Sequence, residues 1–139
     1  MRKRFSYGHC GKLVRDKCIE RGLADDSTCK FSYKYLEDHE FQTHLFNKLQ
    51  EEVLEILESK NKEQICSELV DVLDVVDAIR KHNNISKQEL SIAQKHKHKI
   101  RGKFDSKLFI EWHEMGPSQF YYYCLENSDK YPEIEIKFK

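Results

Sequence analysis

The chain has 139 residues, of which 35% are charged and 12% aromatic, a composition typical of one globular domain with a hydrated surface. Its 24 basic and 24 acidic residues cancel, which argues against non-specific binding of nucleic acid or membrane by the whole surface. The five cysteines form no Cys-x-x-Cys pair, and no apolar run is long enough to span a membrane or to act as a secretion signal. These features predict a cytoplasmic protein without disulfides.

The N-terminal part of the chain predicts little regular structure. Residues 1–11 are basic and then aromatic, which indicates an irregular arm. Lys12–Glu20 is a short amphipathic segment, predicted to be partly helical and to end near Gly22. Apolar and polar residues then alternate from Cys29 to Leu36, which predicts a short strand.

Two long helices are predicted next, from Glu37 to about Ser59 and from Lys62 to about His82. In both segments, apolar residues recur at steps of three and four. In the first segment these are Phe41, Leu45, Leu49, Val53, Ile56 and Leu57, and in the second Ile65, Leu69, Val72, Leu73, Val76 and Ile79. The short polar break between the segments predicts that the two helices pack as an antiparallel hairpin.

A third helix is predicted to begin at Ser86, where Glu89 completes a capping box, and to end at Gly102. Further strands are predicted at Lys107–Trp112, Phe120–Cys124 and Glu133–Phe138. The predicted fold is therefore mainly α, a helical hairpin plus a third helix, with a small β element from the N- and C-terminal segments. Residues 1–113 are predicted to form the main domain and residues 114–139 a β extension of it.

Four carboxylates lie on the flanks of the apolar stripes of the two long helices: Glu52, Glu55, Glu68 and Asp71. At about 100° per residue, the members of each pair point the same way, and an antiparallel hairpin would bring all four to one seam. A buried, unpaired carboxylate is so costly that such a cluster should either protonate or bind cations. Oxygen ligands favour Mg²⁺, with Mn²⁺ as a possible substitute. The alternative is an ordinary solvent-facing helix surface.

Other charged residues are candidates for catalysis and for binding a phosphate chain. Glu51 lies about 100° from Glu52, so it could serve as a general base, bind a further metal, or simply face solvent. Lys48 lies one turn before Glu52 and either pairs with it or reaches the substrate. Lys97 and Arg101, one turn apart on the third helix, could bind phosphate, or could form a solvated helix end.

The acidic pattern Glu51-Glu52-x-x-Glu55 and Glu68-x-x-Asp71 resembles the signature of the all-α nucleoside triphosphate pyrophosphatases, the superfamily of MazG and the phosphoribosyl-ATP pyrophosphohydrolases. Two further stretches resemble one phosphoribosyl-ATP pyrophosphohydrolase-like subgroup of this superfamily. These are Lys12-Leu13-Val14-Arg15-Asp16-Lys17 and Arg101-Gly102-Lys103-Phe104. In order and at suitable distances, the three matches cover about residues 11–113.

The resemblance implies a Mg²⁺-dependent hydrolase that cleaves a nucleoside triphosphate between the α and β phosphates, releasing a monophosphate and pyrophosphate. One role that it suggests is the clearing of unwanted nucleotides. It implies metal binding by the four carboxylates, substrate binding that includes Arg15 and Lys17, and a homodimer or dimer of dimers. Two alternatives stay open. One is a non-catalytic nucleotide-binding protein of the same fold, and the other is an RNA-binding or interaction module that uses Lys95–Lys103 and Tyr121–Tyr123.

Overall fold

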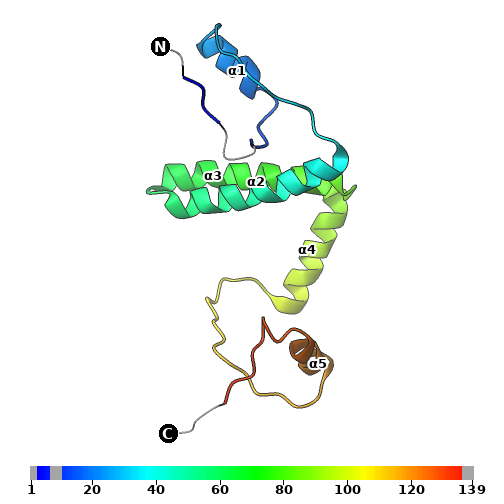
Figure 1. The fold of residues 1–139 in the computed structure, drawn as a ribbon. Coiled ribbons are helices and arrows are strands. Elements are labelled where there is room, and N and C mark those ends of the chain that lie inside the picture. The colour runs from blue at the N-terminus through cyan, green and yellow to red at the C-terminus, as the bar shows by residue number, and fades with distance from the viewer. Residues whose placement is uncertain (1–2, 7–10, 136–139) are drawn as a thin grey trace. The chain divides into compact units, whose positions relative to one another are not determined.

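The computed structural model describes residues 3–6 and 11–135. Regular structure in these residues is helical, and the mainly α fold class is confirmed (Figure 1). The helices are α1 (Cys18–Asp25), α2 (Asp38–Glu58), α3 (Lys62–His82), α4 (Lys87–Arg101) and α5 (Gln119–Glu126). The chain divides into two compact units, Met1–His96 and Lys97–Lys139.

Helices α2 and α3 form the predicted hairpin and lie side by side (Figure 1). Local capping explains where each helix begins. Glu37 and Glu40 form a capping box at the start of α2, and the side chain of Asn61 accepts a hydrogen bond from the backbone N–H of Gln64 at 2.9 Å at the start of α3. Both helices therefore start within one residue of the predicted positions.

The hairpin has an acidic flank and an apolar flank. Leu45 on α2 and Val75 on α3 are buried and mark the sides on which the helices meet. At about 100° per residue, the carboxylates lie in this seam or to one side of it, and exposed apolar side chains lie to the other side. When two antiparallel helices pack together, side chains displaced in the same rotational sense from the seam point to the same side of the pair. The exposed apolar side chains of α2 and α3 therefore share one face of the hairpin. They are Phe46, Val53, Leu57, Ile65, Leu69, Leu73 and Val76, named here the apolar face.

Helix α1 starts later than the sequence predicts. Residues 12–17 are not helical, and α1 begins at Cys18 and continues to Asp25. Gly22 was expected to end the helix, and this expectation is wrong because Gly22 lies inside it. A Cβ atom at this position would lie 2.5 Å from Cζ of Phe31, so the glycine allows close packing of that ring.

Helix α4 confirms the predicted third helix at both ends. The backbone N–H of Ser86 donates to Glu89 at 2.7 Å, and the backbone N–H of Glu89 donates to Ser86 Oγ at 3.1 Å, which completes the predicted capping box. At the other end, Gly102 takes a φ of +73° and donates its N–H to the carbonyl of His98 at 2.9 Å. This positive φ is the reason that glycine suits the helix end.

The predicted β element is not found in the part of the chain that the structure describes. Phe120–Cys124, predicted as a strand, lies in α5, because the Ser118 hydroxyl accepts the N–H of Tyr121 at 3.1 Å and caps a helix. The segments Cys29–Leu36 and Lys107–Trp112 are irregular, since neither pairs with another strand. Residues 133–135 are irregular too, and residues 136–138 of the last predicted strand lie outside the described residues.

Aromatic side chains hold the second unit together around α5. The ring of Phe120 lies 6.0 Å from that of Tyr123, 5.7 Å from that of Tyr131 and 5.8 Å from that of His113, measured between centroids. Phe120 and Tyr123 meet because they lie three residues apart on a helix. In both units, none of the described helices is both long and apolar enough to cross a membrane.

Candidate metal centre

Three carboxylates from the two helices of the hairpin gather at one point. Glu52 and Glu55, one turn apart on α2, and Glu68 on α3 each offer an oxygen atom, and these oxygens all lie within 4.8 Å of one another. The three-residue spacing places the first two side chains on one flank of α2, and the packing of the hairpin brings the third across from α3. The predicted convergence at the helix seam is therefore found for three of the four carboxylates.

Glu52 is the most buried member of this cluster, with only 3% of its surface exposed. Its Oε1 accepts from Lys48 Nζ at 2.6 Å, as the four-residue spacing of the two side chains allows. Its Oε2 is buried without a hydrogen-bond partner among the described residues, and so is Oε2 of Glu68. Burying a carboxylate oxygen without a hydrogen-bond donor costs free energy. A bound cation would offset this cost.

The pKa values around the cluster point the same way. The pKa of Glu55 is raised, first by burial, then by the nearby charge of Glu52 and by a hydrogen bond with Glu68. For Lys48, partial burial opposes the charged form, but hydrogen bonds to Glu52 and Glu51 outweigh it and raise the pKa. Oxygen donors, crowded negative charge and two unpartnered buried oxygens together fit a hard divalent cation such as Mg²⁺ or Mn²⁺.

Asp71, the fourth predicted ligand, makes a different contact. Its carboxylate pairs with the guanidinium of Arg15, whose Nη1 also donates to Asp74 Oδ2 at 2.7 Å. These two pairs raise the pKa of Arg15, with the hydrogen bond to Asp74 contributing most. The cluster in the structure therefore has three carboxylates, and Asp71 forms an ion pair with Arg15 instead of joining it.

Glu51, the predicted general base, is held by two lysines. Its Oε1 accepts from Lys12 Nζ at 2.8 Å and from Lys48 Nζ at 3.1 Å. Partial burial opposes the charged form of Glu51, but these two hydrogen bonds outweigh it and lower the pKa of the carboxyl group. A lowered pKa makes Glu51 a weaker proton acceptor near neutral pH, so the geometry suits the anchoring of lysines better than proton abstraction.

The remaining predicted binding residues are not among the side chains that make the ion pairs described above for the cluster. Lys17 is the N-cap residue of α1, is exposed, and makes no ion pair with a described acidic side chain. Lys97 and Arg101 are exposed on the last turns of α4 and belong to the second unit. Their predicted role in binding phosphate stays a prediction.

No family model, curated protein or solved structure matches this chain.

Two residues of the site were missed from the sequence. Asp74 lies three residues after Asp71 and on the same flank of α3, so a helix projection could have revealed it. The pairing of Lys12 with Glu51 joins residues 39 positions apart, and the local sequence gives no sign of it.

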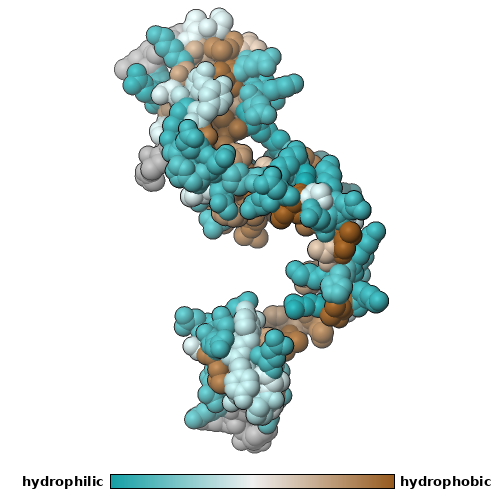
Figure 2. Space-filling model, turned by 90° about the vertical axis from the view of Figure 1, so that its right-hand side faces the viewer, coloured by the Kyte–Doolittle hydropathy of each residue, from teal (hydrophilic) through white to brown (hydrophobic). Residues whose placement is uncertain are grey.

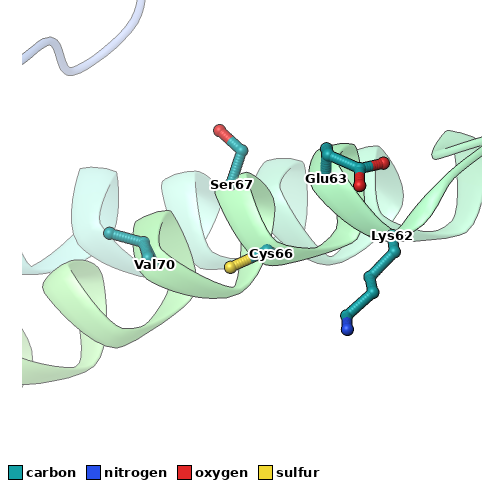
Figure 3. Close-up of a pocket in the computed structure, with 5 residues that line it drawn as sticks. All are labelled: Lys62, Glu63, Cys66, Ser67 and Val70. Carbon is teal, nitrogen blue, oxygen red and sulfur yellow. The ribbon is translucent and has the colours of Figure 1, made fainter.

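An open hollow lies along the first turns of α3 (Figure 3). It is lined by Lys62, Glu63, Cys66, Ser67 and Val70. All of these residues come from one helix, and none belongs to the carboxylate cluster. The hollow is therefore separate from the candidate metal centre, and a surface formed by a single helix cannot enclose a ligand.

Proposed function

We propose that this protein is a Mg²⁺-dependent nucleotide pyrophosphohydrolase, which cleaves a nucleoside triphosphate between the α and β phosphates. One observation carries the proposal: Glu52, Glu55 and Glu68 meet within 4.8 Å, although Glu52 is 3% exposed and has an oxygen without a donor. Protein carboxylates gathered in this way bind divalent cations, and such sites commonly act on phosphates. The acidic pattern of the superfamily covers the same three residues.

In this proposal, Glu52, Glu55 and Glu68 hold the cation, which when bound supplies Lewis acidity and neutralises charge on the phosphate oxygens. The protein's own cations act beside them. Lys48 Nζ donates to Glu52 Oε1 at 2.6 Å and so fixes the position of this ligand. Arg15 presents a forked guanidinium at the edge of the cluster, a shape that suits phosphate oxygens.

The proton of the attacking water needs an acceptor. Glu51 is poorly matched to this task, because hydrogen bonds from Lys12 and Lys48 lower the pKa of its carboxyl group. We therefore assign to Glu51 the positioning of Lys12 and Lys48, both of which it binds through Oε1.

The test is a panel of nucleoside triphosphates with MgCl₂, in which pyrophosphate release is measured. We expect release by the natural protein and a loss of at least about a hundredfold in Glu68→Gln, because the amide cannot supply a ligand charge. Glu63→Gln is the matched control, since Glu63 lies on α3 but outside the cluster. Equal release by the natural protein and Glu68→Gln would overturn the assigned mechanism.

We also propose that the protein is a homodimer, or a dimer of dimers, formed through the apolar face. Leu45 and Val75 are the apolar side chains that the described structure buries, whereas Leu57 is 77% exposed and Leu73 is 65% exposed. Figure 2 shows apolar side chains at the surface of the molecule beside hydrophilic ones. Two hairpins that pack through these faces would form a four-helix bundle and bury both stripes.

The alternative function, a module that binds RNA or another partner, is favoured by one observation. The basic residues between Lys95 and Arg101 at the end of α4 are exposed and pair with no described acidic side chain. A protein that acts on free nucleotides in the cytoplasm, as proposed here, should bind RNA weakly. RNA affinity that falls steeply with salt, without pyrophosphate release, would support the alternative.

A further inference from the structure

The segment that leads into α1 crosses the acidic flank of the hairpin from one helix to the other. Lys12 Nζ binds Glu51 Oε1 on α2 at 2.8 Å, and three residues later Arg15 binds Asp71 and Asp74 on α3. In Figure 1, this segment runs from beside the hairpin into α1. We name residues 11–17 the strap.

Each end of the strap is anchored next to a member of the carboxylate cluster. Glu51 adjoins Glu52 in the chain, and Asp71 lies one turn after Glu68, so the positive charges of Lys12 and Arg15 lie at the border of the cluster. Two cationic side chains thus occupy carboxylates that neighbour members of the cluster on α2 and α3. Together with Lys48, they partly neutralise the negative charge of this flank.

The strap is held by contacts that are easily broken. The side chain of Arg15 is 58% exposed and that of Lys12 is 37% exposed. Ion pairs with this exposure contribute little net stability, because water competes for both partners. A divalent cation bound to the cluster would repel both side chains and attract their partners Glu51, Asp71 and Asp74. The cation and the strap therefore compete electrostatically on this flank although they bind different carboxylates.

We propose that binding of a divalent cation displaces the strap. Lys12 and Arg15 pair with carboxylates of the hairpin while no divalent cation is bound, and they leave these partners when the cation binds. The freed lysine and arginine are then available to the phosphate chain of a substrate. This inference rests on the proposed function, since it requires the cluster to bind a metal. Lys12 thereby becomes a residue of the site, and Arg15 changes partner from Asp71 and Asp74 in the metal-free protein to the phosphate chain in the metal-bound protein.

Side-chain NMR of the full-length protein tests the exchange directly. Spectra of lysine ammonium and arginine guanidinium groups distinguish paired from hydrated side chains, and Lys12→Met and Arg15→Gln variants identify the signals. With EDTA, we expect both signals at paired positions. With saturating MgCl₂, both should move to hydrated positions, while Lys34, which binds Glu40 at 2.7 Å at the start of α2, stays unchanged.

The carboxyl carbons of Glu52, Glu55 and Glu68, recorded in the same titration, separate the two proposals. If these signals shift with MgCl₂ while Lys12 and Arg15 stay paired, the strap proposal fails and the metal centre stands. If the carboxyl signals do not respond to MgCl₂, the metal centre and the strap proposal both fail. Both responses together, over the same range of MgCl₂ concentration, support the exchange.

Metal affinity gives a second readout that needs no substrate. Because each strap cation repels a divalent ion, Lys12→Met and Arg15→Gln should each tighten Mn²⁺ binding about fivefold, as measured by calorimetry. Lys34→Met is the matched control, because it also removes a paired lysine, but its partner Glu40 lies about 18 Å along α2 from Glu52. Equal Mn²⁺ affinity in all three variants and the natural protein would overturn the proposed competition.

Discussion

Replacing Glu68 with glutamine is expected to stabilise the metal-free protein. Glu68 makes no ion pair with a described basic side chain, and its buried Oε2 has no hydrogen-bond partner. Its carboxylate also lies within 4.8 Å of those of Glu52 and Glu55. At that separation, one pair of negative charges repels by about 1 kcal/mol in water and by about 3 kcal/mol at the lower effective dielectric of a protein surface.

Glutamine removes this repulsion while keeping the shape of the side chain, and its amide can donate to the neighbouring carboxylates. We therefore expect the free energy of unfolding in EDTA to rise by about 1 to 3 kcal/mol in Glu68→Gln. With MgCl₂ at about a hundred times its dissociation constant, the natural protein should gain about 2.7 kcal/mol, and the variant much less. Urea unfolding followed by circular dichroism measures both quantities.

Glu63→Gln on the same helix is the control, and it should change stability by less than about 0.5 kcal/mol in either condition. A Glu68→Gln variant that is less stable than the natural protein in EDTA would show that the carboxylates do not strain the fold. Equal stabilisation of both proteins by MgCl₂ would show that Glu68 is not a ligand.

Three further predictions concern other parts of the fold. Leu73→Glu places a charge on the apolar face and should convert the proposed dimer to a monomer, as measured by analytical ultracentrifugation. Ile92→Glu on α4 is the control and should leave the dimer intact. Dissociation by both variants, or by neither, would contradict a dimer formed through the apolar face. Hydrogen bonds from Lys81 and Arg80 lower the pKa of Asp77 to about 2 from an ordinary value of 3.8. The ion pairs of Asp77 therefore contribute their full stability above about pH 3.8 and lose it as the pH falls through about 2. A carboxyl ¹³C titration of Asp77 with a midpoint near 3.8 would refute this prediction. Ser86→Ala removes the side-chain half of the α4 capping box and should lower the free energy of unfolding by about 1 kcal/mol in urea, while unchanged stability would show that the cap contributes nothing.

The long helices could be predicted because their signals are local. The apolar spacing of α2 and α3, and the Ser86 and Glu89 pair at the start of α4, depend on residues three or four positions apart. The same local reasoning failed at Phe120–Cys124, which was predicted as a strand and lies in α5. Ser118 was the better signal, because its hydroxyl caps the helix.

The candidate site was predictable only where it depends on the hairpin. Glu52, Glu55 and Glu68 follow from helical spacing and from the pairing of two neighbouring helices. The partner of Asp71 does not follow from either, because Arg15 comes from a segment 56 residues earlier that has no regular structure. The same holds for Lys12 and Glu51, so the strap could be found only in three dimensions.

The central claim is that Glu52, Glu55 and Glu68 bind a divalent cation together. Anomalous diffraction from a crystal grown with MnCl₂ tests it most directly, because the anomalous signal locates Mn²⁺ independently of the protein density. We predict a peak at coordination distance, about 2.2 Å, from a carboxylate oxygen of each of the three residues. Three separately hydrated carboxylates, with no anomalous peak between them, would contradict the account.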